Sequence, residues 1–486
     1  MKAKNKRSFF QRTDATAISK SFFGISGWSD WFILAMTAVL GLFHLSHIFE
    51  VYIGNDDWEH LASAWFIFNG YEPYRNFFQH HNPLWWYVLA PFFYFFKEPY
   101  YVFYIARLIS AGFVIGSIIL IGKIIRYLRF DPKVFLYTLF VYLAYPMTYL
   151  RLIHQRPDTP MIFFLILGFY LWIRFMTEEK ERLLIGCYLS FFISFMFLQK
   201  ALMFMLPFGL YQLWLLFKKE LNWKSFLHAI TLPVLLFVGY VGYLLYQGAL
   251  VRYWETNYIL NMHVFRDYWA HQMTIYDMIF HTMGALFLII ALFKTSGAKK
   301  LLVMTVCGGV LFWFLLPRPY AYYYYPWLIV SSLMIGIGVR KWKTCYRILF
   351  FFPAFILAEV AFCLSDWNFF YTPSDIKELR TEIKSQDKLM PYGSSYLAMF
   401  NPEPEHYYWY FLADVALWDN ALFHYTKIPE WNEMTYKEKP LYIISHSISS
   451  LEFTLSPHKV MQTDFDFINK YYERLPTKLP VWKRKN

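Results

Sequence analysis

The residues best suited to chemistry form a short acidic string, Asn55-Asp56-Asp57-Trp58-Glu59-His60, which follows the first long apolar stretch. Three carboxylates so close together repel one another unless a cation, a proton or water separates them. Such a carboxylate can act as a general base that takes the proton of an attacking hydroxyl group. Asp56 is the candidate base and Asp57 the alternative. The ordinary interpretation is a solvated acidic turn that caps a helix, because Asp is a favoured N-cap residue.

A second group of residues has the chemistry to hold an anionic leaving group such as a phosphate. Negative charge that grows on a leaving group needs positive charge in a site shielded from water. Arg318 is the first candidate for this contact, followed by His81 and Lys200. His80 is a candidate metal ligand, so a divalent metal is an open alternative, although a histidine pair is also common in ordinary loops.

Two further motifs carry candidate binding residues, Gln155-Arg156-Pro157-Asp158 and Pro317-Arg318-Pro319-Tyr320. Asp158 would either position an acceptor or pair with Arg156. Tyr320 and the tyrosines at 322–325 are typical of the aromatic belt of a membrane protein. One or two of them would also line a groove for a substrate chain or stack on a ring.

The composition decides what kind of protein must position these residues. The chain has 486 residues, of which 57% are hydrophobic and only 16% charged. Soluble domains carry about a quarter charged residues, so the apolar excess needs lipid to cover it. The formal net charge is +12, but the cations lie in short runs between apolar stretches, which excludes nucleic-acid binding. The four cysteines have no CxxC spacing, so neither a zinc site nor a disulfide framework is indicated.

Eleven segments are apolar and long enough to be predicted as membrane-spanning helices. Lys and Arg concentrate in alternate loops, on the same side as the basic N-terminus, which predicts that the N-terminus is cytoplasmic and the C-terminus outside. We therefore expect a cytoplasmic segment at 1–30 and a transmembrane domain at 31–365. The predicted spans are 31–49, 103–122, 134–150, 160–174, 183–198, 201–217, 227–246, 277–294, 299–316, 322–338 and 346–364.

Two outer segments are too long to be simple turns. The first loop, 50–102, contains an apolar run at 84–96 that would invert every later loop if it crossed the membrane. We predict that its helices lie along the membrane surface, as aromatic-rich amphipathic helices do. The segment 366–486 has short hydrophobic runs between polar patches, which predicts a small soluble α/β domain on the outer face.

The first-loop string from Asp56 to Pro83 resembles the first outer loop of the GT-C glycosyltransferases, which include protein O-mannosyltransferases and lipid A aminoarabinose transferases. The two motifs that contain Asp158 and Arg318 strengthen the resemblance, which covers roughly residues 30–340. Asp56-Asp57 stands where the family usually has Asp-Glu. The resemblance implies an inverting transfer of a sugar from a polyprenyl-phosphate donor, at the outer face of the cytoplasmic membrane. The acceptor would be a lipid, a glycan or a protein, and no cofactor is implied with certainty.

A transporter or flippase of lipid-linked substrates is the main alternative function. Transporters are typically built from repeats, with ionisable residues or broken helices at mid-membrane depth. Here no two-half symmetry is seen and the polar residues cluster at the outer surface, which favours an enzyme. A membrane-embedded ligase or phosphotransferase acting on the same lipid carriers is a second alternative, and a purely structural scaffold is the third.

Overall fold

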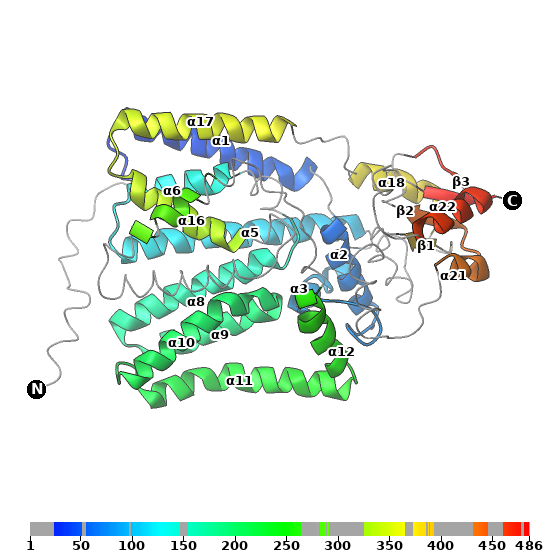
Figure 1. Cartoon of the computed structure of the whole chain (residues 1–486), viewed down its shortest axis with the longest axis horizontal. Helices are drawn as coiled ribbons and strands as arrows, with labels where there is room; N and C mark the ends of the chain where they lie inside the picture. The colour runs from blue at the N-terminus through cyan, green and yellow to red at the C-terminus, as the bar shows by residue number, and fades with distance from the viewer. Residues whose placement is uncertain are drawn as a thin grey trace, which may run out of the picture.

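The computed structural model describes residues 24–50, 55–96, 99–145, 154–263, 279, 282–287, 289–290, 325–364, 373–384, 387, 389–392, 431–445, 460–477 and 481–485. Most of these residues are helical, which confirms the predicted all-helical character of the apolar part. The longer helices are α1 (Trp28–Glu50), α5 (Pro99–Tyr127), α6 (Lys133–Ala144), α8 (Asp158–Glu178), α9 (Glu181–Phe197), α10 (Leu202–Phe217), α11 (Trp223–Tyr246), α16 (Tyr325–Val339) and α17 (Thr344–Leu364). They run roughly parallel to one another as a bundle (Figure 1).

Five stretches of the described helices are long and apolar enough to cross a membrane. Each overlaps one of the predicted spans, because a run of about twenty apolar residues both favours a helix and needs an apolar environment. The count of eleven spans and the orientation stay predictions, and the predicted span 299–316 lies outside the described residues. The five stretches are Trp28–Ser46, Tyr101–Tyr127, Asp158–Glu178, Gln199–Phe217 and Trp223–Tyr246.

Helices α8 and α9 form a tightly packed hairpin. Glu179 ends α8 in the left-handed conformation, with φ 52°, and α9 begins two residues later. Gly168 lets α9 approach closely, because a Cβ atom placed there would lie 2.5 Å from the ring of Phe191. Small residues at a helix contact are typical of membrane bundles, where dense packing replaces the hydrophobic effect.

A buried carboxylate joins three helices at the end of the bundle where α1 begins. Asp30 Oδ1 lies 2.8 Å from the guanidinium of Arg347 on α17 and accepts a 2.8 Å hydrogen bond from the hydroxyl of Tyr137 on α6. Asp30 Oδ2 lies 2.8 Å from the ammonium of Lys133. Because a buried charge is costly without partners, this network fixes how α1, α6 and α17 meet.

Short helices gather at the opposite end of the bundle. They are α2 (Asn55–Phe68), α3 (Leu84–Leu89), α4 (Phe92–Phe95), η3 (Gln199–Ala201), α12 (Leu250–Trp254), the π-helical turn η4 (Glu255–Leu260) and α13 (Asn261–His263). In Figure 1, α2 runs across the ends of the long helices rather than along them. With six and four residues, α3 and α4 are too short to span a bilayer. That they lie along a membrane surface stays a prediction.

The described residues after 372 form a four-stranded mixed sheet with helices. Its elements are α18 (Pro373–Glu382), β1 (Leu389–Tyr392), α21 (Trp431–Glu438), β2 (Tyr442–Ser445), α22 (Val460–Tyr471), β3 (Tyr472–Arg474) and β4 (Val481–Arg484). The strand order is β1-β2-β4-β3; β1 and β2 are parallel and the other pairs antiparallel. The sheet lies at the same end of the bundle as α2 and α3 (Figure 1). A separate domain that begins at 366 stays a prediction.

Candidate functional site

Asp57, in the first turn of α2, is completely buried and held on several sides. Its Oδ2 lies 3.7 Å from the guanidinium of Arg107 and 3.3 Å from Nδ1 of His154. Its Oδ1 accepts a 3.2 Å hydrogen bond from the backbone N–H of Gln155. The side-chain amide of Gln155 donates in turn to the Asp57 carbonyl. This carboxylate therefore joins α2 to α5 and to the segment that precedes α8.

Arg107 is a guanidinium inside the candidate span Tyr101–Tyr127, with only 2% of its surface exposed. It lies over the ring of Phe103, 4.1 Å from the ring centroid. A cation inside a membrane helix is costly unless a counter-charge faces it. Asp57 supplies that counter-charge.

Glu59, two residues after Asp57, is a buried carboxyl of a different kind. Burial raises the pKa of Glu59 from 4.5 to about 8, although a hydrogen bond with Gln79 acts in the opposite direction. Gln79 also donates to the hydroxyl of Ser63 at 2.8 Å, and Ser63 donates to the Glu59 carbonyl at 2.8 Å. At neutral pH Glu59 therefore carries a proton, which removes its repulsion of Asp57.

His60 lies between the first-loop carboxylates and the histidine pair. The indole N–H of Trp86 on α3 donates to its Nδ1 at 3.0 Å. Burial lowers the pKa of His60 from 6.5 to about 4. The charge of Lys200 lowers this pKa further, whereas the charges of Asp158 and Asp57 raise it. The imidazole is therefore neutral. Because an indole N–H is only a donor, the proton of His60 belongs on Nε2.

The rings of His80 and His81 are tilted by 41° with their centroids 4.0 Å apart, and the ring centroids of His81 and His60 lie 5.6 Å apart. Burial lowers the pKa of His80 to about 3 and that of His81 well below 6.5. All three imidazoles are therefore uncharged at neutral pH. They offer hydrogen bonds but no formal positive charge to a ligand.

The backbone of this histidine pair is held from three elements. The carbonyl of His80 accepts hydrogen bonds of 2.8 Å from the amides of Gln199 and Asn261. The carbonyl of His81 accepts from the hydroxyl of Tyr74. The neighbouring loop residue is anchored separately: Asn82 donates to the carbonyl of Phe195 and accepts from the hydroxyl of Tyr253 at 2.9 Å. A loop with this many contacts presents its side chains in a fixed arrangement.

Two cations lie beside Asp158, Lys200 in η3 and Arg156, and Lys200 is the more exposed of the two. Its ammonium lies 3.7 Å from Asp158 Oδ1, and 18% of the side chain is exposed. The guanidinium of Arg156 lies closer to the same carboxylate, 3.1 Å from Oδ2, with 7% of its side chain exposed. Asp158 thus pairs with Arg156, and its role towards an acceptor stays a prediction. Two cations therefore face one carboxylate beside the histidines.

The donor set most similar to a metal site consists of Glu59, His60 and His81. One ligand atom from each lies within 4.8 Å of the others, and His80, the predicted ligand, is not in the set. The arrangement does not fit a resident metal ion. A ligating imidazole must offer an unprotonated nitrogen, but Nδ1 of His60 is occupied by the indole N–H of Trp86 and its Nε2 carries the proton.

The fold brings most of the predicted site residues into one cluster. Asp57, Asp158 and Lys200 are all close enough to His60 for their charges to shift its pKa. The ring of His60 in turn lies beside the ring of His81. The backbone of Asp56 lies in the first turn of α2, whereas its side chain lies outside the described part of the chain. Arg318 and Tyr320 also lie outside the described residues, so the predictions about them stay predictions.

Sequence reasoning missed two partners of Asp57. Arg107 had a recognisable signal, a single cation within an apolar stretch of α5, since such residues are rare and usually paired. His154 had no signal of its own beyond its place next to the Gln155-Arg156-Pro157-Asp158 motif. Only the three-dimensional structure assigns both to the same carboxylate.

Comparisons with known proteins find one family and one similar fold. The sequence profile of a family described as dolichyl-phosphate-mannose-protein mannosyltransferase matches residues 80–243. Among solved structures, ArnT from Cupriavidus metallidurans in the apo state is similar with a TM-score of 0.60 and 10% sequence identity, over 94% of this chain and 98% of that chain. The same protein bound to undecaprenyl phosphate gives a TM-score of 0.59 at the same identity and coverage. A search of curated protein sequences gives no match.

Proposed function

Because the chain resembles the GT-C membrane glycosyltransferases, in sequence over residues 80–243 and in fold over nearly its whole length, we propose that it transfers a sugar from a polyprenyl-phosphate donor to an acceptor hydroxyl. The reaction takes place at the outer face of the cytoplasmic membrane and inverts the configuration of the anomeric carbon. The observation that carries the proposal is the cluster of Lys200, His60 and His81 beside the acidic start of α2. Similarity to a fold that binds undecaprenyl phosphate in ArnT supports the choice of donor.

The donor phosphate is held by Lys200 with the neutral imidazoles as hydrogen-bond donors. Lys200 is the cation of the cluster with the larger exposed fraction, 18% of its side chain against 7% for Arg156. As the bond between the anomeric carbon and the phosphate oxygen breaks, its electron pair moves onto the phosphate. A cation aligned beforehand stabilises that charge at little cost in reorganisation. Arg318 is the second cation proposed for this contact.

Asp56 is the proposed general base. The carboxylate of Asp57 is fully enclosed and held by Arg107, His154 and Gln155, so it has a positioning role at the start of α2. Glu59 is protonated at neutral pH and cannot accept a proton. Of the three carboxylates at the start of α2, these contacts leave Asp56 to take the proton of the acceptor hydroxyl as its oxygen attacks the anomeric carbon. A single displacement of this kind inverts the configuration, and no general acid is needed because phosphate is already a good leaving group.

Turnover of a defined donor by the purified protein tests this proposal. Protein reconstituted in nanodiscs is incubated with radiolabelled undecaprenyl-phosphate sugars and a membrane extract as the source of acceptors. We expect release of undecaprenyl phosphate together with a labelled product. A control protein, Lys224→Met, changes an exposed lysine that is not part of the cluster.

The Lys200→Met protein should turn the donor over about tenfold to a hundredfold more slowly than the Lys224→Met protein, because a charge-assisted hydrogen bond contributes roughly 1.5–3 kcal/mol. Equal rates for the two variants would contradict the role of Lys200. If labelled donor crosses the bilayer of proteoliposomes without forming product, the protein is a flippase and the proposed function is wrong.

A further inference from the structure

Tyr74, in the turn that leads from α2 to the histidine pair, has an uncommon backbone conformation. Its φ angle is 65°, in the left-handed region that a bulky side chain seldom adopts. In the described part of the chain the other non-glycine residues with a positive φ lie where helices end, at Arg129, Glu179, Lys219 and Lys439. There a left-handed residue is ordinary. Tyr74 ends no helix, and such strain persists only where the surrounding structure imposes it.

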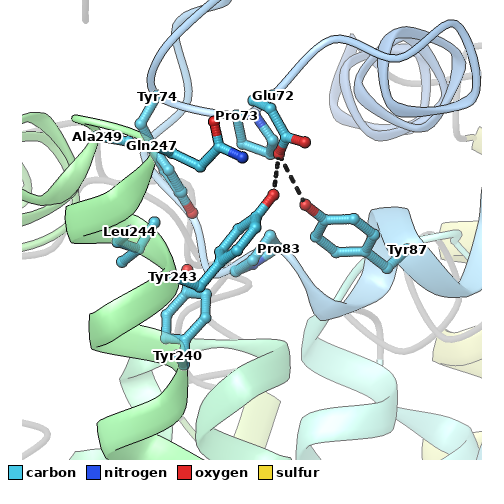
Figure 2. Close-up of a pocket in the computed structure, with 10 residues that line it drawn as sticks. All are labelled: Glu72, Pro73, Tyr74, Pro83, Tyr87, Tyr240, Tyr243, Leu244, Gln247 and Ala249. Carbon is cyan, nitrogen blue, oxygen red and sulfur yellow. Dashed lines mark hydrogen bonds between the residues drawn. The ribbon is translucent and has the colours of Figure 1, made fainter.

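The turn around Tyr74 is held on both sides. The backbone N–H of Tyr74 donates to the carbonyl of Phe77 at 3.0 Å. The backbone N–H of Glu72 donates to the side chain of Asn76 at 2.8 Å, and that of Asn76 donates to the carbonyl of Glu72 at 2.9 Å. The carboxylate of Glu72 also accepts a hydrogen bond from the hydroxyl of Tyr243 on α11 (Figure 2). These contacts fix the direction in which the side chain of Tyr74 leaves the backbone.

The buried side chain of Tyr74 contacts the groups that hold two histidines. Its hydroxyl donates to the carbonyl of His81. Its ring centroid lies 6.5 Å from that of Trp86, whose indole N–H donates to Nδ1 of His60. The ring of Tyr253 on α12 meets the ring of Tyr74 edge-on, with the centroids 5.2 Å apart. One side chain therefore braces the peptide of one imidazole and the hydrogen-bond partner of another.

The strained backbone and the side-chain contacts of Tyr74 depend on each other. A negative φ would rotate the Cα–Cβ bond about the N–Cα axis and carry the phenol away from the carbonyl of His81. In Figure 2 the side chain points inward, into a small pocket that Tyr240 also lines. The buried hydrogen bond and the aromatic packing thus offset the cost of the left-handed backbone. If Tyr74 only filled space, neither the hydroxyl nor the strain would be needed.

We propose that Tyr74 is a positioning residue for the transfer reaction: it fixes the peptide of His81 and the indole of Trp86, so that the imidazoles of His81 and His60 meet the donor phosphate in a set direction. The inference rests on the proposed function, in which these imidazoles donate hydrogen bonds to the phosphate. Donors that are already aligned stabilise the growing charge without reorganisation. Loss of the Tyr74 contacts should therefore slow the chemical step, whereas donor binding is still supported by Lys200.

Steady-state kinetics of Tyr74→Phe test this role. The variant keeps the ring and loses the hydroxyl, and it is assayed in nanodiscs with the radiolabelled undecaprenyl-phosphate sugar that the wild type consumes. We expect kcat to fall by about threefold to tenfold, the effect of one hydrogen bond between uncharged groups. The KM for the donor should stay within about twofold of the wild-type value, because the lost alignment acts in the transition state. Tyr71→Phe, in the same loop but 38% exposed, should leave both constants unchanged.

Tyr74→Asn separates the side chain from the turn. Asparagine adopts the left-handed conformation more readily than most residues, so this variant preserves the turn and removes both the phenol and the ring. We expect kcat to fall at least as far as in Tyr74→Phe. A wild-type kcat in Tyr74→Asn would show that position 74 serves only the turn, and it would overturn the inference.

Chemical modification of His81 gives a readout that needs no turnover. The protein in nanodiscs is treated with diethyl pyrocarbonate, which acylates neutral imidazoles, and the rate at each histidine is measured by mass spectrometry of peptides. His81 is half-buried, so it reacts mainly when its loop opens. In Tyr74→Phe the rate at His81 should rise by about threefold to tenfold, because the loop has lost one hydrogen bond. His228, near the beginning of α11 and with 65% of its side chain exposed, should react at the wild-type rate.

Several results with Tyr74→Phe would overturn the inference. These are a kcat equal to that of Tyr71→Phe, a KM that rises as much as kcat falls, an unchanged reaction rate at His81, or an equal acceleration at His81 and His228. Failure of the proposed function appears separately. If the wild type never consumes the donor while Tyr74→Phe still exposes His81, the proposed function is wrong and the bracing of His81 by Tyr74 stands.

Discussion

The ion pair between Asp57 and Arg107 gives the most quantitative prediction about the site. Arg107→Met keeps a long side chain in α5 but leaves the buried carboxylate without its strong cation. At the observed separation of 3.7 Å, two unit charges attract by about 4–5 kcal/mol at an effective dielectric constant of about 20. Breaking a buried pair by removing one partner costs a similar amount, roughly 3–5 kcal/mol. We expect Arg107→Met to destabilise the protein by about that much.

A double-mutant cycle isolates the interaction between the two residues. Unfolding by SDS in mixed micelles is followed by tryptophan fluorescence for Arg107→Met, Asp57→Asn and the double variant. Asp57→Asn keeps the size of the side chain and removes its charge. The double variant should be more stable than the sum of the single effects predicts, by a coupling of at least about 1 kcal/mol. Arg126→Met, an exposed change on the same helix, should have little effect. Additive effects within about 0.5 kcal/mol would refute the pairing.

Three further predictions concern topology, protonation and packing. A cysteine that replaces the exposed Asn76 should react with a membrane-impermeant thiol reagent in intact cells, whereas the native, exposed Cys345 should react only after permeabilisation. The reverse pattern would contradict the predicted orientation of the chain in the membrane. Burial raises the pKa of Glu59 from 4.5 to about 8, so between these pH values the folded state binds a proton that the unfolded state does not. The free energy of unfolding should therefore fall as pH rises from about 4.5 to 8, by up to about 1.4 kcal/mol per pH unit. Glu59→Gln should remove this slope in thermal unfolding between pH 5 and 8, and an unchanged slope would mean that another group titrates. Gly168→Ala should destabilise the protein by about 1–3 kcal/mol in the SDS assay because the new Cβ meets a ring on α9, whereas Gly209→Ala, with open space around it, should not; equal effects would show that the hairpin adjusts.

The sequence predicts the helices well because their signal is local. A run of apolar residues such as 227–246 specifies a spanning helix by itself, and α11 is observed at Trp223–Tyr246. The prediction for the run at 84–96 comes instead from the charges of the later loops, and it stays a prediction, although Pro91 separates two short helices there, α3 and α4.

The electrostatic state of the site could not be read from the sequence. Asp57 and Glu59 are two residues apart, yet one faces a buried guanidinium from α5 and the other retains a proton because of burial. These environments depend on contacts between residues about 50 to 100 positions apart, such as Asp57 with Arg107 and His154. Neither periodicity nor composition encodes such contacts. The hydrogen bonds that Glu72 accepts from Tyr87 and Tyr243 are similar, because Tyr243 reaches Glu72 only when α11 packs against the first loop.

Donor turnover by first-loop variants tests the central claim most directly. Wild-type protein and Asp56→Asn are compared in nanodiscs with radiolabelled undecaprenyl-phosphate sugar and acceptor extract, and folding is checked by gel filtration. Loss of a general base typically slows a reaction by about 10²–10⁴-fold, so we predict a loss of transfer in that range with donor binding retained. Normal transfer by Asp56→Asn, by Asp57→Asn and by the double variant would contradict the account, because the acidic start of α2 would then not be the catalytic site.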